Sequence, residues 1–182
     1  MDNAAAARRV LVAGIGNIFC ADDGFGVEVI RRLATAPLPD GVRVVDFGIR
    51  GLHLAYEMLD GAYDQVILVD ALPQNAPPGT IAVVEAELTA SDQDEGGAEW
   101  GAHGMNPVAV LRLVRRIGGS APNVLVVGCE PARLDEDIGL SPVVAAAVDE
   151  AAQLVLRLVT GEEDVRVSGN PGADRRTQPQ PS

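Results

Sequence analysis

Short runs of consecutive apolar residues alternate along the chain with segments in which apolar residues recur every three or four positions. The runs predict strands that are buried on both faces, and the spaced segments predict amphipathic helices. The predicted strands cover residues 10–13, 43–45, 65–69, 80–84 and 123–127. The predicted helices begin near residues 27, 52, 107 and 142. In the second helix the buried stripe is predicted to consist of Leu52, Ala55, Tyr56 and Leu59.

This alternation predicts an α/β domain of three layers, α/β/α, with a twisted, mostly parallel five-stranded sheet and helices on both faces. The strand at 80–84 follows the third strand too closely for a helical crossover, so we expect it to run antiparallel to its neighbour. Asn106-Pro107 and Ser141-Pro142 each place a capping residue before a proline suited to the first helical position.

The chain is predicted to form one domain over residues 1–160. Residues 89–104 are polar and glycine-rich, which predicts a surface loop. Residues 161–182 are rich in glycine, proline, glutamine and charge, and we expect a disordered C-terminal tail there.

Composition excludes several classes of function. The formal net charge of -12 and the pI near 4.4 argue against nucleic acid and against an anionic membrane surface as partners. All 14 basic residues are arginine, so chemistry that requires a lysine is excluded. Two widely spaced cysteines, and no apolar run of about 18 residues, predict a reduced cytoplasmic protein without a membrane segment.

The most distinctive stretch is GIGNIFCADDGFG at residues 14–26, which joins the first strand to the first helix. It begins like a nucleotide-binding loop, but Phe19 stands where the third glycine of a dinucleotide fingerprint belongs. Asp22 and Asp23 would also repel a phosphate at the helix N-terminus. We therefore expect a cation site and no nucleotide cofactor, with Asp23 facing the ligand and Asp22 capping the helix.

Further candidate ligands lie where other predicted strands end, since sites in such sheets collect at the carboxyl ends of the strands. Asp46 and Asp70 each end a strand, and His103 precedes a helix. Asp23, Asp70 and His103 can converge there, and two carboxylates with one imidazole suit nickel, zinc or another first-row metal. Simpler roles stay open: turn-forming aspartates, a solvated loop histidine at 103, and a structural role for His53.

The sequence offers no evident nucleophile. It contains no G-x-S-x-G motif, and neither Cys20 nor Cys129 has a histidine close in sequence. A three-ligand metal site would instead leave positions open for substrate or water, as a catalytic or transfer site requires.

Five stretches in order resemble one family, the nickel-iron hydrogenase maturation endopeptidases, over about residues 10–158. They are GIGNIFCADDGFGVEVI from residue 14, DFGIRG from residue 46, VILVDAL from residue 66, HGMNPVAVL from residue 103, and VVGCEP from residue 126 followed by GLSP. The resemblance implies an enzyme that removes a C-terminal extension from the hydrogenase large-subunit precursor.

The resemblance also implies that Asp23, Asp70 and His103 form a metal-binding triad. Some members carry Glu where this sequence has Asp23. The nickel is expected to arrive already inserted in the precursor, so that the enzyme checks metal loading before it cuts. DFGIRG replaces a more glycine-rich loop, and we expect Asp46 and Gly48 within it to contact the substrate.

Two rival functions stay open from the sequence. One is a non-catalytic module that binds nickel and precursor as a checkpoint. The other is a Rossmann-like nucleotide-binding enzyme, which Phe19 and the two adjacent aspartates disfavour.

Overall fold

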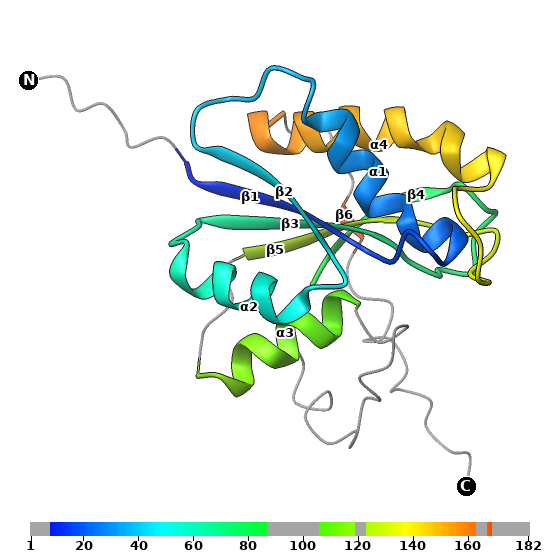
Figure 1. Ribbon diagram of the computed structural model, residues 1–182. Helices are drawn as coiled ribbons and strands as arrows, with labels where there is room; N and C mark the ends of the chain where they lie inside the picture. Colours follow the sequence, from blue (N-terminus) through cyan, green and yellow to red (C-terminus); the bar gives the residue numbers. More distant parts are fainter. Residues whose placement is uncertain (1–7, 87–105, 119–122, 163–166, 169–182) are drawn as a thin grey trace, which may run out of the picture.

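The computed structural model describes residues 8–86, 106–118, 123–162 and 167–168. The chain folds into a central sheet covered by helices (Figure 1). The strands are β1 (Val10–Ile15), β2 (Val42–Gly48), β3 (Gln65–Ala71), β4 (Ile81–Glu85), β5 (Asn123–Cys129) and β6 (Val167–Ser168). The helices are the 3-10 turn η1 (Ala21–Gly24), α1 (Phe25–Leu33), α2 (Gly51–Asp60), α3 (Pro107–Arg116) and α4 (Pro142–Thr160).

The order of the strands across the sheet is β2-β1-β3-β5-β4-β6. Strands β2, β1, β3 and β5 are parallel, and β4 runs antiparallel to β5. Both features confirm the predictions of a mostly parallel sheet and of an antiparallel strand after residue 80. The two-residue strand β6, which pairs with β4, was not predicted. It lies within the segment expected to be a disordered tail, most of which is outside the described residues.

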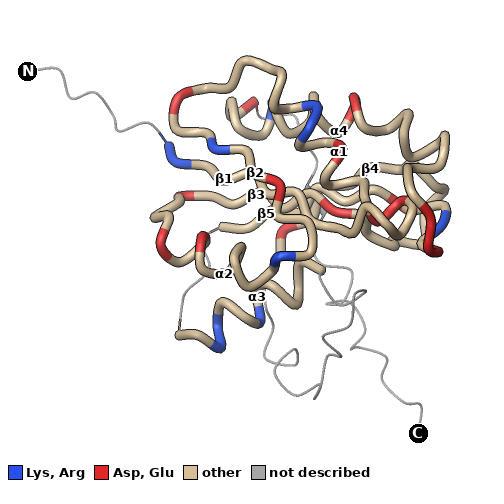
Figure 2. The backbone as a smooth tube through the Cα atoms, viewed as in Figure 1, with Lys and Arg blue, Asp and Glu red and all other residues tan. Residues whose placement is uncertain are grey.

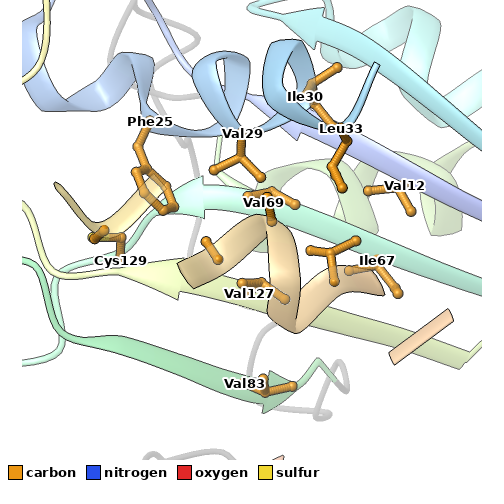
Figure 3. Packing of buried hydrophobic residues seen from close by; sticks show 14 of the residues in the cluster. Val12, Phe25, Val29, Ile30, Leu33, Ile67, Val69, Val83, Val127 and Cys129 are labelled. Atoms are coloured by element: carbon orange, nitrogen blue, oxygen red, sulfur yellow. The ribbon is translucent and has the colours of Figure 1, made fainter. Parts of the chain in front are cut away.

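The helices form two layers: α1 packs against α4 on one face of the sheet, and α2 packs against α3 on the other (Figure 1). Successive side chains of β1 point to opposite faces of the sheet, because side chains alternate along a strand. Val10 and Val12 join the core beneath α1 and α4, while Leu11 and Ala13 join the core beneath α2 and α3. Figure 3 shows the first core, where Phe25 and Val29 of α1 meet Val69 of β3. A strand buried on both faces explains why β1 reads as an unbroken apolar run.

The predicted buried stripe of α2 is wrong at two positions. Leu52 and Tyr56 are exposed, whereas Leu54, Ala55 and Met58 are buried. Apolar residues occur on more than one side of this helix, so its sequence leaves the buried face ambiguous. Packing against β1, β2 and α3 decides which side turns inward.

The two predicted helix caps have different outcomes. Asn106 caps α3 as expected, since its side chain accepts a hydrogen bond of 2.9 Å from the Ala109 N–H. Ser141 precedes α4 but makes no capping bond, because its hydroxyl donates to Asp22 instead. Residues 89–104, predicted as a surface loop, lie outside the described residues. No helix in the described ranges is long and apolar enough to cross a membrane.

Candidate active site at the carboxyl edge of the sheet

The loop after β1 folds back over the end of its own strand. Gly16 has a φ of +128°, and a Cβ at this position would lie 1.8 Å from the backbone oxygen of Asp23. No side chain fits there, so only glycine lets the Asp23 backbone approach β1 this closely. The Gly16 N–H also donates to the Gly48 oxygen at 3.1 Å, which ties this loop to the loop after β2.

The other glycines of the loop bring helix α1 close to the sheet. A Cβ at Gly26 would lie 2.2 Å from the Val69 oxygen and 2.3 Å from the Ile15 oxygen. A Cβ at Gly14 would lie 2.4 Å from a side-chain carbon of Ile30. These glycines therefore serve the packing of α1 on β1 and β3.

Asp23 is a half-buried residue within η1, two residues before α1 begins. One of its carboxylate oxygens accepts a hydrogen bond of 2.7 Å from the Asn17 N–H. Gly24 occupies the N-cap position of α1, and no side chain caps that helix. The bond to Asn17 holds the Asp23 carboxylate across its own loop, at the end of β1.

Asp22 does not cap the helix, contrary to the prediction. It is fully buried, and its carboxylate accepts hydrogen bonds from the N–H groups of Ala132 (2.8 Å), Arg133 (3.0 Å) and Ser141 (2.6 Å) and from the Ser141 hydroxyl (2.9 Å). These partners are more than 100 residues away in sequence, so no local pattern signalled them. Asp22 thereby fastens the loop at residues 131–141 to η1.

Asp70 lies inside β3, one residue before the strand ends, and only 2% of its surface is exposed. Its Oδ1 atom has no hydrogen-bond partner within the described part of the chain. Burial raises the pKa of Asp70 well above its ordinary value, the charge of Asp23 raises it further, and a hydrogen bond from the Ala71 N–H opposes the shift. The structure thus buries an acceptor oxygen without satisfying it, which is unusual outside functional sites.

Asp23 and Asp70 act on each other electrostatically, as the effect of Asp23 on the pKa of Asp70 requires. Two interacting carboxylates, one with an oxygen that has no partner within the described residues, fit a divalent cation, which would offset their like charge and occupy that oxygen. His103 lies outside the described residues, so the triad stays a prediction. Within the described residues no group of three or more His, Cys, Asp and Glu side chains could hold a metal.

The two residues predicted to bind substrate lie next to the glycine loop. Asp46 pairs with Gly14 across β1 and β2, and Gly48 adopts a φ of +53° where the strand register shifts. Arg50 closes this turn by donating to the backbone oxygens of Asp46 and Phe47. Asp46 and Gly48 are thus at the same edge as Asp23, and their contact with substrate stays a prediction.

Glu130 is a buried acid that the sequence reasoning missed. It follows β5 directly, and its carboxylate accepts hydrogen bonds from the N–H groups of Gln74 and Ala76. Glu130 therefore holds the loop between β3 and β4. The rule that selected Asp46 and Asp70, an acid where a predicted strand ends, could have selected Glu130 as well.

Neither cysteine is suited to act as a nucleophile. Burial, followed by the charges of Asp23 and Glu136, raises the pKa of Cys20. Burial, followed by the charges of Asp22, Glu130 and Glu150, raises the pKa of Cys129 to about 11. Both thiols are protonated at neutral pH, and the thiolate is the reactive form.

His53, for which a structural role stayed open, lies exposed on α2.

Figure 2 shows acidic positions both at the end of the molecule where the loops after the parallel strands lie and at the opposite end. What distinguishes the carboxyl edge is therefore the burial of its aspartates, not the number of acidic residues. The fold and site together define a three-layer α/β/α protein whose loops present paired carboxylates at the carboxyl edge of a parallel sheet.

Comparisons with known proteins assign this class to a family. The sequence profile described as hydrogenase maturation protease matches residues 27–158. The hydrogenase 2 maturation protease of Escherichia coli K12 is 31% identical over 151 residues, covering 81% of this chain and 88% of that protein. The chain belongs to the hydrogenase maturation protease family.

Solved structures agree with this assignment. A hydrogenase 2 maturation peptidase from Thaumarchaeota archaeon SCGC_AB-539-E09 is 34% identical, with a TM-score of 0.63 over 84% of this chain and 99% of that chain. The hydrogenase-maturating endopeptidase HybD from Escherichia coli is 29% identical, with a TM-score of 0.65 over 85% and 94% of the two chains. The predicted fold class and the predicted enzyme class, a peptidase of hydrogenase maturation, are confirmed. The matches favour a protease over a non-catalytic checkpoint module.

Proposed function

We propose that this protein removes the C-terminal extension from the nickel-loaded precursor of a nickel-iron hydrogenase large subunit, in the cytoplasm. The observation that carries the proposal is the buried Asp70, whose Oδ1 atom has no partner among the described residues and whose carboxyl group is influenced by the charge of Asp23. The two free, buried cysteines agree with a reducing compartment.

In this proposal the nickel belongs to the substrate. Asp23 and Asp70, together with His103, would hold the precursor by its nickel and so place the scissile peptide at the carboxyl edge of the sheet. A precursor without nickel would bring no cation to Asp23 and Asp70, so docking would gain no stabilisation from these two carboxylates. The site would then act on loaded precursor only.

The chemistry that this site supports is hydrolysis by an activated water, of the aspartic type. A carboxylate at the site accepts a proton from the water, whose oxygen attacks the scissile carbonyl carbon. The C–N bond then breaks, the proton passes to the leaving amine, and a new carboxylate and a free C-terminal peptide are released. Asp46 and Gly48 would contact the precursor beside this point.

Intact-mass measurement of the precursor tests the proposal. Incubation with the wild-type protein is expected to release the C-terminal peptide from nickel-loaded precursor and not from nickel-free precursor. Asp23→Asn, Asp70→Asn and His103→Ala are each expected to slow cleavage at least about 100-fold, because each removes a group that would hold the nickel or accept the proton from the water. Asp149→Asn, at an exposed aspartate of α4, is the matched control and should cleave at the wild-type rate.

Three results would contradict the proposal. Wild-type cleavage rates in the three site variants would show that Asp23, Asp70 and His103 take no part in the reaction. Equal cleavage of nickel-free precursor would remove the docking role of nickel. Binding of precursor without release of any peptide would identify a checkpoint module instead.

A further inference from the structure

The three most exposed large apolar side chains within the described residues all lie at the edge of the sheet that carries Asp23. Phe19 is 61% exposed, Ile49 is 57% exposed and Ile138 is 74% exposed. They belong to the loops that follow β1, β2 and β5, respectively. We call these three residues the apolar rim.

The backbone on either side of Phe19 is fixed to the loop at 131–141. The Asp137 N–H donates to the Phe19 oxygen at 3.1 Å, and the Ala21 N–H donates to the Asp137 oxygen at 2.9 Å. These bonds form a parallel bridge between Cys20 and Asp137. Phe19 and Ile138 flank this bridge, so they lie on two backbone segments that are hydrogen-bonded to each other. Asp22 also joins these segments, because its carboxylate accepts from the Ala132 and Ser141 N–H groups.

Ile49 is held on the other side of the same loop. Its neighbour Gly48 accepts the bond from Gly16, and Gly16 lies directly against the backbone of Asp23. Asp23, whose carboxylate accepts from the Asn17 N–H, lies in the same loop as Phe19, and the Gly16–Gly48 hydrogen bond joins that loop to the turn that carries Ile49. All three residues of the apolar rim are therefore on backbone that belongs to the Asp23 loop or is hydrogen-bonded to it.

We propose that the apolar rim is a docking surface for the precursor polypeptide, and that it binds an extended segment with apolar side chains next to the scissile bond. This inference rests on the proposed function. An endopeptidase must hold a polypeptide on both sides of the bond it cuts, and the rim residues lie on the Asp23 loop and on the two loops hydrogen-bonded to it. Exposed apolar groups on a backbone that is already ordered gain from losing water without a large loss of conformational freedom.

Steady-state kinetics on nickel-loaded precursor test the rim. Phe19→Ala and Ile138→Ala are each expected to raise KM about tenfold, the loss typical of truncating an important apolar contact, with a much smaller change in kcat. A purely structural defect would instead lower the fraction of active enzyme, and so kcat, at unchanged KM. Both side chains are exposed, so the variants should keep the wild-type melting temperature.

Ile117→Ala is the matched control. Ile117 is also an exposed isoleucine, but it follows the last turn of α3, and the chain then enters β5 at the opposite, amino edge of the sheet. Its KM should equal that of the wild type. An equal rise of KM in Ile117→Ala, or unchanged KM in both rim variants, would overturn the proposal.

The outcomes separate this inference from the proposed function. If the wild-type protein releases no peptide from nickel-loaded precursor, the proposed function fails. If it cleaves but the rim variants keep their KM, only the rim assignment fails. Sedimentation analysis tests whether a second copy of this chain binds the rim instead of the precursor. A wild-type dimer that Phe19→Ala converts to monomers would show that it does, and would overturn the precursor assignment.

Discussion

Asp22 and Asp23 are adjacent and chemically identical, yet the fold gives them opposite environments. Asp22 points inward and satisfies four donors from a distant loop, while Asp23 crosses its own loop to reach the Asn17 N–H. Asp70 is also buried but lacks such donors for Oδ1. Donors, rather than burial alone, decide which buried carboxylate is structural and which is available for a ligand.

Replacing Asp22 should destabilise the protein strongly. Asp22→Asn leaves buried donors from the loop at 131–141 without an acceptor, so we expect the free energy of unfolding to fall by about 3 kcal/mol at pH 7. Urea unfolding measures the change. Asp149→Asn, which removes an exposed pair with Arg32, should change the same quantity by less than about 1 kcal/mol. Equal effects of the two variants would contradict the structural role of Asp22.

The contribution of Asp22 should depend on pH. Burial by itself raises the pKa of Asp22, but the hydrogen bonds from Ser141, Arg133 and Ala132 outweigh it and hold the pKa below its ordinary value of 3.8. A lowered pKa in the folded state means that the stabilisation is fully present above the ordinary value and is lost as the pH falls through the folded value. The gap in stability between wild type and Asp22→Asn should therefore narrow below about pH 4.

At the scale of elements, the unit that builds the site is β1, its glycine loop and α1. The strand and the helix were predictable because burial on both faces and helical periodicity leave clear patterns. The close contact of α1 with β1 and β3 depends on Gly14 and Gly26, where a side chain would meet neighbouring atoms. The loop between them can be long and irregular because these two glycines hold its ends together.

Gly26→Ala tests this unit. The new methyl group would overlap the backbone oxygens of Val69 and Ile15, which cannot move without displacing the sheet, so we expect a loss of about 3 kcal/mol in the free energy of unfolding. Gly24→Ala is the control, because Gly24 has a helical φ of -71° and a Cβ there would lie 3.3 Å from the nearest atom. It should change stability by less than about 1 kcal/mol. A loss as large in Gly24→Ala would refute the close-approach argument.

At the scale of the molecule, the parallel order of four strands gathers the loops after β1, β2, β3 and β5 at one edge. Buried acids then fasten these loops to each other: Asp22 holds the loop after β5, and Glu130 holds the loop after β3. The edge is thus a connected frame around Asp23 and Asp70.

Nickel should raise the melting temperature of the protein, whereas nucleotides should leave it unchanged. Ni²⁺ at ten times its Kd would stabilise the fold by about 1.4 kcal/mol, or roughly 4 °C in melting temperature, because it would bind Asp23 and Asp70 in the folded state only. NAD and ATP should cause no shift, since the glycine loop serves packing. Thermal-shift measurement with wild type and Asp70→Asn distinguishes these cases. A nucleotide shift, or a nickel shift that survives Asp70→Asn, would contradict the cation site.

The sequence by itself determined the three-layer architecture, the antiparallel strand after residue 80 and the family, because these depend on local periodicity and on motifs in order along the chain. It also placed Asp23 and Asp70 at one edge, since parallel strands end together. Only the tertiary structure decided the rest. The buried face of α2, the role of Asp22 and the hydrogen bond of the Ser141 hydroxyl all depend on partners far away in sequence. GIGNIFCADDGFG contains both kinds of information. The contact of Asp23 with Asn17 lies within the loop itself, whereas the role of Asp22 depends on residues 132–141 and the need for Gly26 depends on Val69 of β3.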